Sequence, residues 1–504
     1  MTDIGRGTRL SAASLAARLP YDRSAVTPGI VHLGIGAFCR AHMAVYVDNL
    51  LKTDPSWGII AASLRRPDTR DALAPQDFLY TLAVRSGSGT TTRVIGSLLE
   101  VLDASTQRDR LLAAMTDPRI RIVSLTVTEK GYCCDPATRT LDPRHLDIIH
   151  DLAHSDVPRS APGLLVKALE LRRAAGVAPF TVLCCDNLPA NGETTARVVT
   201  AFAALRSPDL ADYIESEVAF PSTMVDRIVP ATTDDDRRSI MEETGLWDAW
   251  PVVTEPFSQW VIEDRFSAGR PPFETVGAQV VADVRPFELM KLRMLNGSHS
   301  TLAYLGYLAG YEFVSDAIAD SAFHRLIYDL MTEEVISTLP TGIGDLGAYR
   351  DALLDRFANP ALRHRTWQIA MDGSQKLPQR LLGTIRDRLA RGAPIARAAL
   401  GVAAWMRYVT GIDEQGREID VRDPLAERLR QISDSAGGAP KRLVGGLLEV
   451  IEVFGDDLPR NESFRTVVTG HLTSLFGRGA LETIRSIVNR DEAQVSNKRA
   501  VPPS

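Results

Sequence analysis

Residues 284–306, VRPFELMKLRMLNGSHSTLAYLG, stand where the pattern of the chain changes, and they carry its most reactive group of side chains. Apolar strand patterns alternate with helical ones before this stretch, whereas the chain after it is helical almost throughout. One regular helix at about 100° per residue would place Asn296 and His299 within about 140° of Lys291. Glu288 joins the same face. That face is either a solvated polar surface or an acid/base centre that needs no metal.

Length and composition limit the possible folds and partners. A chain of 504 residues exceeds what one hydrophobic core usually supports, so we expect two domains, 1–284 and 285–504. The net charge of −6 argues against a protein that binds nucleic acid through phosphate contacts. The sequence has no apolar run of about 18 residues and no apolar core of a secretory signal near its start, so we predict a cytoplasmic protein without a membrane partner.

The cysteines favour the same compartment. There are five, Cys39, Cys133, Cys134, Cys184 and Cys185, and an odd number in adjacent pairs fits no disulfide framework. The spacing also matches no usual zinc site. We therefore expect reduced thiols and no bound metal.

The segment 29–42, GIVHLGIGAFCRAH, has the pattern of a dinucleotide-binding turn. An apolar strand runs into Gly34 and Gly36 and then into a helical stretch, which brings backbone N–H groups up to a pyrophosphate. Cys39 stands where a third glycine is usual, so a plain tight turn is the alternative. A second apolar run at 57–64 ends in Arg65 and Arg66 instead of an acidic residue, which leaves both NAD and NADP open as cofactor.

Two further apolar strands, 120–127 and 179–185, end in polar side chains. Thr128 and Glu129 follow the first strand, and Asp186 and Asn187 follow the second. Strands that alternate with helices indicate a largely parallel α/β sheet, in which ligands bind beyond the carboxyl ends of the strands. We therefore expect these residues at the ligand-binding edge of the first domain.

Two polar groups elsewhere are candidates for substrate contacts. Asp226 and Arg227 lie in an apolar context, where a buried ion pair and a role in a site are both open. In the helical half, residues 363–380 are rich in cations and in polar side chains that commonly bind ligands. This segment is either an exposed charged surface or part of the binding site for an anionic substrate.

Together these motifs resemble the polyol-specific long-chain dehydrogenases, the mannitol dehydrogenase family, over nearly the whole chain. The motifs are GIGAF with Arg40 and His42, TEKGY from Thr128, CDN from Cys185, TMVDRI from Thr223, and Lys291 with Asn296 and His299. The family includes mannitol 2-dehydrogenase and fructuronate reductase, which is also called D-mannonate oxidoreductase. The stretches SLTVTEKGYC from Ser124 and HRTWQIAMDGSQKLPQRLL from His364 are similar to the fructuronate reductase branch.

The resemblance implies a Rossmann-type N-terminal domain with a mostly parallel sheet, a mostly helical C-terminal domain that binds substrate, and hydride transfer to NAD without a metal. It implies Lys291 as general acid/base, Asn187 and Asn296 as oxyanion donors, and His299 as a substrate-positioning group. Asp226 matches a substrate-site position, and Glu288 matches a residue implicated in proton passage. The expected cofactor-binding residues are Gly34, Ile35, Gly36, Ala37, Phe38, Arg65, Thr128 and Glu129.

The chemistry of alcohol oxidation accounts for this set independently. A base must take the hydroxyl proton while hydride leaves the same carbon, and a lysine can do so only if its pKa falls from about 10.4 toward 7–8. Two amide donors would hold the developing oxyanion, and the loss of one such donor typically costs about 10²- to 10³-fold in rate. A lysine in this role replaces a metal.

The sequence leaves more than one substrate class open. Mannonate and fructuronate carry a carboxylate that cations should match, and Arg365, Lys376 and Arg380 are the candidates. Interconversion of D-mannonate and D-fructuronate is therefore the expected activity. Mannitol 2-dehydrogenase or another polyol dehydrogenase is the main alternative, and a nucleotide-binding sensor is a remote one. Nothing resembles a dedicated assembly segment, so we expect a monomer or a weak dimer.

Overall fold

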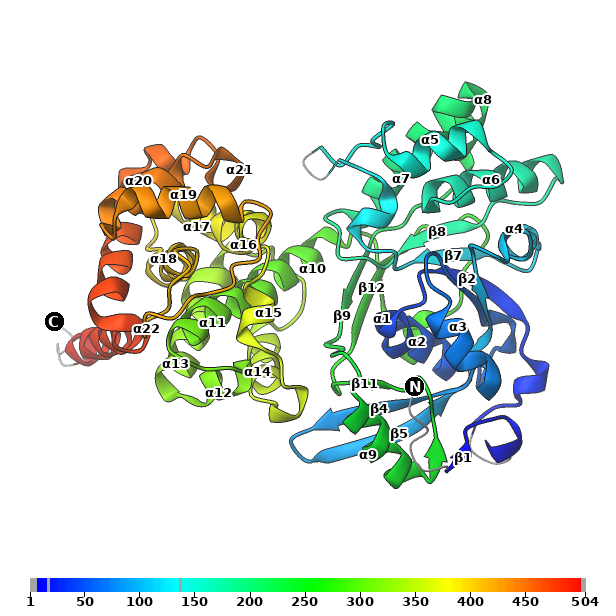
Figure 1. Cartoon of the computed structure of the whole chain (residues 1–504), viewed down its shortest axis with the longest axis horizontal. Coiled ribbons are helices and arrows are strands. Elements are labelled where there is room, and N and C mark those ends of the chain that lie inside the picture. The colour runs from blue at the N-terminus through cyan, green and yellow to red at the C-terminus, as the bar shows by residue number, and fades with distance from the viewer. Residues whose placement is uncertain (1–6, 16–18, 136–137, 500–504) are drawn as a thin grey trace. The chain divides into compact units, whose positions relative to one another are not determined.

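A computed structural model describes residues 7–15, 19–135 and 138–499 of the chain (Figure 1). Contacts between Cα atoms divide the chain into two compact units, one ending at Arg285 and one beginning at Pro286. We describe each by itself as unit 1 and unit 2. The described part of the chain has no helix with both the length and the apolarity needed to cross a lipid bilayer.

Unit 1 is built on a five-stranded sheet with the order β6-β3-β2-β7-β8, in which every neighbouring pair is parallel. Two three-stranded sheets, β11-β4-β5 and β13-β12-β9, and the short pair β1-β10 complete it. The strands are β1 Thr8–Arg9, β2 Pro28–Leu33, β3 Gly58–Ser63, β4 Tyr80–Ser86, β5 Gly89–Ile95, β6 Leu98–Asp103, β7 Ile122–Leu125, β8 Thr181–Cys184, β9 Thr223–Asp226, β10 Leu246–Trp247, β11 Val252–Thr254, β12 Gln259–Glu263 and β13 Gln279–Val281.

Helices cover both faces of the five-stranded sheet, because successive side chains on its buried strands point to opposite cores. Val31 and Leu33 of β2 belong to one core, which also contains residues of α4, α6 and α7. Ile30 of the same strand belongs to the other core, with residues of α1 and α2. The helices of unit 1 are α1 Ala37–Ala41, α2 Met43–Leu50, α3 Asp68–Leu73, α4 Arg108–Thr116, α5 Leu146–Ala153, α6 Ala161–Ala174, α7 Asn191–Arg206, α8 Pro208–Glu217, α9 Asp234–Thr244 and the start of α10 Arg285–Met290.

Unit 2 is helical apart from turns and isolated bridges in the part that the structure describes. Its α-helices are α11 Gly297–Leu308, α12 Val314–Ala319, α13 Ser321–Asp329, α14 Leu346–Phe357, α15 Thr366–Ala370, α16 Gly373–Leu377, α17 Gly383–Ala390, α18 Ala396–Tyr408, α19 Ala426–Ala436, α20 Pro440–Leu448, α21 Ile451–Phe454 and α22 Glu462–Arg499, which bends at Gly479. Three π-helical segments join some of them: η7 Lys291–Asn296, η8 Leu330–Val335 and η11 Pro378–Leu382. The predicted fold class, a parallel-sheet domain followed by a mostly helical one, is confirmed.

The helix α11 is the packing centre of unit 2, and two glycines let other backbone segments approach it closely. A Cβ on Gly297 of α11 would lie 2.8 Å from the carbonyl oxygen of Arg380 in η11. A Cβ on Gly401 of α18 would lie 2.6 Å from Oγ1 of Thr301 in α11. Thr301 is β-branched and its hydroxyl donates to the carbonyl oxygen of Gly297, so this side chain cannot move aside cheaply.

We therefore expect the Gly401→Ala variant to lower the free energy of unfolding by about 1–3 kcal/mol, because the added methyl overpacks the α11–α18 contact. Gly470 is the matched control, since it lies inside α22 with no neighbouring atom within 4 Å of an added Cβ. Gly470→Ala should raise stability by about 0.5–1 kcal/mol. Urea unfolding of the two variants measures both effects, and equal shifts would contradict the packing assignment.

The buried His32 of β2 makes the stability of unit 1 depend on pH. Its ring nitrogens lie 2.9 Å from the hydroxyls of Ser124 and Thr126, and burial lowers the pKa of the imidazole from 6.5 to about 4. Between these two values the unfolded chain binds a proton that the folded chain does not bind. This contribution therefore makes the free energy of unfolding fall as pH drops from about 6.5 to about 4. Urea titrations across this range should show a shallower fall for His32→Gln, and an unchanged slope would contradict the assignment.

Candidate functional site

Four of the predicted catalytic side chains lie on one continuous helical segment, which comprises α10, η7 and α11. Lys291 is the first residue of η7 and is buried, and Asn296 is its last residue and is half-buried. His299 follows in α11 and is buried, while Glu288 lies half-buried in α10. A solvated polar face therefore does not describe Lys291 and His299.

The prediction of one regular α-helix is wrong at this point. Residues 291–296 form a π-helical turn, in which backbone hydrogen bonds join residues five apart. Asn296 therefore lies one hydrogen-bonded turn beyond Lys291, and the angles expected from about 100° per residue do not apply between them. Single π-turns inside α-helices occur frequently at functional sites.

His299 lies in a basic and aromatic environment. Its ring centroid is 4.8 Å from that of His364 and 5.1 Å from that of Phe357. Burial, followed by His364, Arg380, Arg356 and Lys376, lowers the pKa of His299 well below its ordinary value. Burial and Lys376 lower the pKa of His364 to about 4, so both imidazoles are neutral at pH 7. Nε2 of His299 and Nδ1 of His364 are buried without a hydrogen-bond partner among the described residues.

The three cations expected to meet a substrate carboxylate differ in their surroundings. Arg380 is half-buried, donates to Oγ of Ser300 at 3.0 Å and has no ion-pair partner within the described ranges. Burial lowers its pKa to about 10. Lys376 donates to the carbonyl oxygens of Ile369 and Met371. Arg365 forms an ion pair of 2.7 Å with Glu312, and both side chains are more than half exposed. Its role as a substrate ligand stays a prediction.

In unit 1 the predicted nucleotide loop has the geometry of a phosphate-binding turn. Gly34 has φ +91°, and a Cβ there would lie 2.2 Å from the carbonyl oxygen of Thr126. Gly36 caps α1, and the nearest atom to its Cβ would be the carbonyl oxygen of Gly34 at 3.9 Å. Position 34 must therefore be glycine, because the backbone at the end of β7 leaves no room for a side chain. Gly36 instead leaves space that a bound group can fill. Ile35, Ala37 and Phe38 complete the turn and the start of α1.

The polar residues after β7 and β8 form one connected edge. The Asp186 carboxylate accepts hydrogen bonds from the backbone N–H groups of Val127 and Thr128 and from the Tyr132 hydroxyl. The hydrogen bonds to Asp186 hold the backbone of Thr128 at a φ of +65°. Thr128, Glu129 and Asn187 are exposed at this edge. Asp186 therefore organises the loop that presents the predicted ligand-binding residues.

Asn191 is a residue whose importance the sequence did not reveal, because Asn-Gly at 191–192 is typical of a turn. It instead begins α7, is buried, and donates to the carbonyl oxygens of Asp186 and Thr223 while accepting from the Thr223 N–H. These bonds tie the end of β8 to β9. Asp226, the last residue of β9, is buried, and the neighbouring Arg227 donates to the carbonyl oxygens of Glu255 and Ala41.

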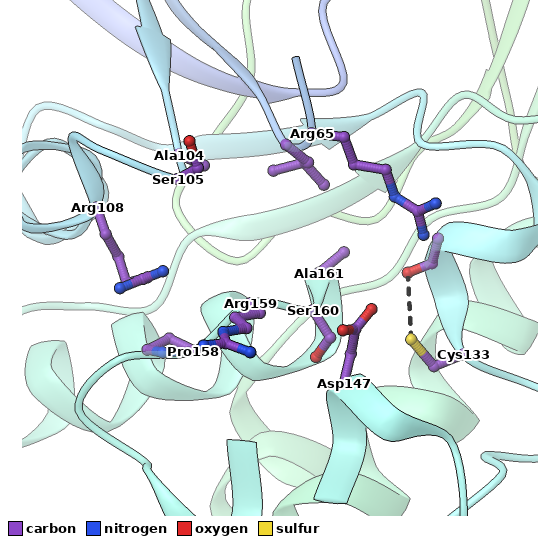
Figure 2. A pocket seen from close by; sticks show the side chains of 12 residues that line it. Arg65, Ala104, Ser105, Arg108, Cys133, Asp147, Pro158, Arg159, Ser160 and Ala161 are labelled. Carbon is purple, nitrogen blue, oxygen red and sulfur yellow. Dashed lines mark hydrogen bonds between the residues drawn. The ribbon is translucent and has the colours of Figure 1, made fainter. Parts of the chain in front are cut away.

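A pocket of about 510 Å³ opens within unit 1, beyond the carboxyl ends of β3 and β6 (Figure 2). Its walls come from Leu64 and Arg65 after β3, the residues between β6 and the start of α4, the loop after β7, and the starts of α5 and α6. Arg65, Arg108 and Arg159 line it, and Arg66 is not among the lining residues.

Three possible metal ligands, Cys133, His145 and Asp147, meet beside this pocket. Nδ1 of His145 already accepts the backbone N–H of Asp147 at the start of α5. Burial raises the pKa of the Cys133 thiol to about 12, so the thiolate that a metal needs is disfavoured. This trio is not part of the predicted acid/base group, and a reaction without a metal stays a prediction.

Comparison with known proteins places both units in one family. Residues 28–275 match the mannitol dehydrogenase Rossmann domain, and residues 283–476 match the mannitol dehydrogenase C-terminal domain. The chain is 48% identical to D-mannonate oxidoreductase of Escherichia coli (strain K12), over 94% of this chain and 98% of that protein. It is 41% identical to mannitol 2-dehydrogenase of Aspergillus fumigatus, over 95% of this chain and 97% of that protein.

A solved structure gives the same result. The mannitol 2-dehydrogenase of Pseudomonas fluorescens, in a ternary complex with NAD and D-mannitol, superposes with a TM-score of 0.84 at 39% identity. The match covers 96% of this chain and all of that one. The chain is therefore an oxidoreductase that belongs to the mannitol dehydrogenase family.

Proposed function

We propose that this protein interconverts D-mannonate and D-fructuronate by NAD-dependent hydride transfer. Two findings support the sugar acid over a neutral polyol. The D-mannonate oxidoreductase is a relative with 48% identity over nearly the full length of both chains. The surroundings of His299 are basic, with Arg380, Arg356 and Lys376 all acting on its imidazole.

Arg380 carries the assignment of substrate class. Its guanidinium is partly desolvated, and no carboxylate among the described residues forms an ion pair with it. A desolvated cation without a counter-ion is costly unless a ligand supplies the negative charge. A guanidinium can hold a carboxylate through two parallel hydrogen bonds, so the carboxylate of an aldonate is a suitable partner.

His299 and His364 can form hydrogen bonds with the same part of the substrate as Arg380. Both rings are neutral at pH 7, and each has one buried nitrogen without a hydrogen-bond partner in the described part of the chain. Buried polar atoms of this kind are normally satisfied by a partner, and substrate hydroxyls can supply it. We assign His299 to substrate positioning, with His364 beside it.

We assign the proton transfer to Lys291, which accepts the hydroxyl proton of the substrate during oxidation and returns it during reduction. The cofactor NAD, when bound, accepts the hydride from the carbinol carbon. Asn296, one π-helical turn from Lys291, donates its amide N–H to the oxyanion that forms, and Asn187 of unit 1 is proposed as the second donor. Glu288, one turn before Lys291 in α10, is proposed to pass the proton onward.

The residues of unit 1 fit a dinucleotide. Gly36 leaves open space at the amino end of α1, and the backbone there can approach a pyrophosphate. The exposed Thr128 and Glu129 and the neighbouring Arg65 follow parallel strands at their carboxyl ends, where nucleotides bind in such sheets. We assign Gly34, Ile35, Gly36, Ala37 and Phe38 to the pyrophosphate-binding turn.

Oxidation of D-mannitol to D-fructose is the second candidate. It is favoured by the full-length match to the Pseudomonas fluorescens enzyme, whose structure contains D-mannitol. The same acid/base residues would serve, and only the counter-ion role of Arg380 would disappear.

The Lys291→Ala variant tests the acid/base assignment. We expect turnover of D-mannonate to fall by at least about 10²-fold, because no other group takes the proton. NADH binding, followed by its fluorescence, should stay within about threefold of wild type, which separates loss of chemistry from loss of the fold. Lys441→Ala, an exposed lysine of α20, is the control and should keep full activity. Undiminished turnover in Lys291→Ala would contradict the mechanism.

Arg380→Gln tests the substrate class against Arg365→Gln. A lost charged hydrogen bond typically costs about 1.5–3 kcal/mol, so kcat/KM for D-mannonate should fall about 10- to 150-fold in Arg380→Gln. The decrease should be far smaller with D-mannitol, which has no carboxylate. Arg365→Gln removes a cation that already pairs with Glu312, so the decrease for D-mannonate should be smaller than in Arg380→Gln. Equal decreases of kcat/KM for the two substrates in Arg380→Gln would contradict the proposal that Arg380 binds the substrate carboxylate.

A further inference from the structure

The pocket beyond β3 and β6 of unit 1 gathers positive charge that the protein itself does not neutralise. Arg65, Arg108 and Arg159 reach it from three elements: the end of β3, the start of α4 and the residues before α6 (Figure 2). None of the three guanidiniums forms an ion pair or a side-chain hydrogen bond within the described ranges. Nε of Arg108 is in addition buried without a partner.

The opposing charge in the pocket is small. Asp147 at the start of α5 is the acidic residue among those that line it, and its carboxylate lies 4.0 Å from Nδ1 of His145. The lining therefore carries three arginines against one aspartate. This excess arises in a chain whose net charge is −6, so it is local to the pocket. Three cations held around one cavity repel each other unless an anion is bound.

The position of Arg65 indicates which anion. It follows β3, the strand that lies beside β2 and comes next after the Gly34–Gly36 turn. In dinucleotide-binding folds this strand end faces the ribose of adenosine, where an acidic residue suits the free 2′-hydroxyl of NAD and an arginine suits the 2′-phosphate of NADP. Leu64 and Arg65 are the residues that line the pocket at this strand end.

We propose that this pocket binds the 2′-phosphate of NADP, with Arg65, Arg108 and Arg159 as its ligands. A volume of about 510 Å³ is within the range of small-molecule sites and suits one phosphorylated nucleoside. A phosphate at pH 7 carries up to two negative charges and three acceptor oxygens, which match the excess charge of the lining. The enzyme thereby accepts NADP in addition to the NAD of the proposed function.

Arg65 and Arg66, which the sequence alone did not distinguish, differ in their relation to the pocket. Arg65 and Arg66 are adjacent, both are exposed, and neither has an ion-pair partner in the part of the chain described. Only Arg65 lines the pocket. Arg66→Gln is therefore a control that removes the same charge from the same loop without changing the site.

Isothermal titration of the full-length protein with adenosine 2′,5′-bisphosphate and with adenosine 5′-monophosphate tests the site directly. We expect the bisphosphate to bind at least about tenfold more tightly than the monophosphate. Arg65→Gln, Arg108→Gln and Arg159→Gln should each lower the affinity for the bisphosphate and bring this ratio close to 1. Arg66→Gln should leave the ratio unchanged. Urea unfolding of each variant should match wild type, since these side chains have no structural partner.

Equal affinity for the two nucleotides would overturn the proposal, and so would an Arg66→Gln variant that lowers the affinity ratio as much as Arg65→Gln does. A third such result is displacement of the bisphosphate by inorganic phosphate at a similar concentration. The last result would indicate a general anion site with no part for adenosine. The titration uses no sugar substrate, so it stands apart from the proposed function. If D-mannonate is not oxidised but the nucleotide ratio holds, only the substrate assignment fails.

Discussion

The π-helical turn at Lys291–Asn296 is the constraint on which the catalytic proposal depends. A lysine and an amide five residues apart would lie on different sides of a regular α-helix, but they are one hydrogen-bonded turn apart here. Directly after this turn, α11 is closely packed on two sides, by the η11 backbone against Gly297 and by α18 at Gly401.

In both proposed ligand sites, arginine side chains have no ion-pair partner among the described residues. In unit 2 the Arg380 guanidinium lies partly desolvated beside two neutral imidazoles, and in unit 1 three arginines line one cavity. Arg172, which serves the fold, instead donates to the carbonyl oxygens of Ala178 and Met115. An arginine without an ion-pair partner adds little to stability, so we attribute both groups of arginines to the binding of a ligand.

Much of this architecture could be predicted from sequence, because β2, β3, β7 and β8 are mostly apolar and are followed by glycine or polar residues. The β4–β5 hairpin was missed, although the glycines at 87 and 89 between β-branched and apolar residues are a signal for it. The π-turn could not be predicted, since the sequence pattern of residues 284–306 is that of a regular helix. The sequence could not separate Arg65 from Arg66, or Arg380 from Arg365. Only the three-dimensional structure shows that Arg65 lines the pocket and that Arg365 pairs with Glu312.

The most direct test of the account is the steady-state rate of the wild-type protein with D-mannonate and with D-mannitol, measured side by side through the absorbance of the reduced cofactor. We expect a clearly higher kcat/KM for D-mannonate, because only that substrate carries a carboxylate that could neutralise Arg380. A higher kcat/KM for D-mannitol would contradict it. The acid/base group would then remain, and the cations around His299 would need a structural explanation.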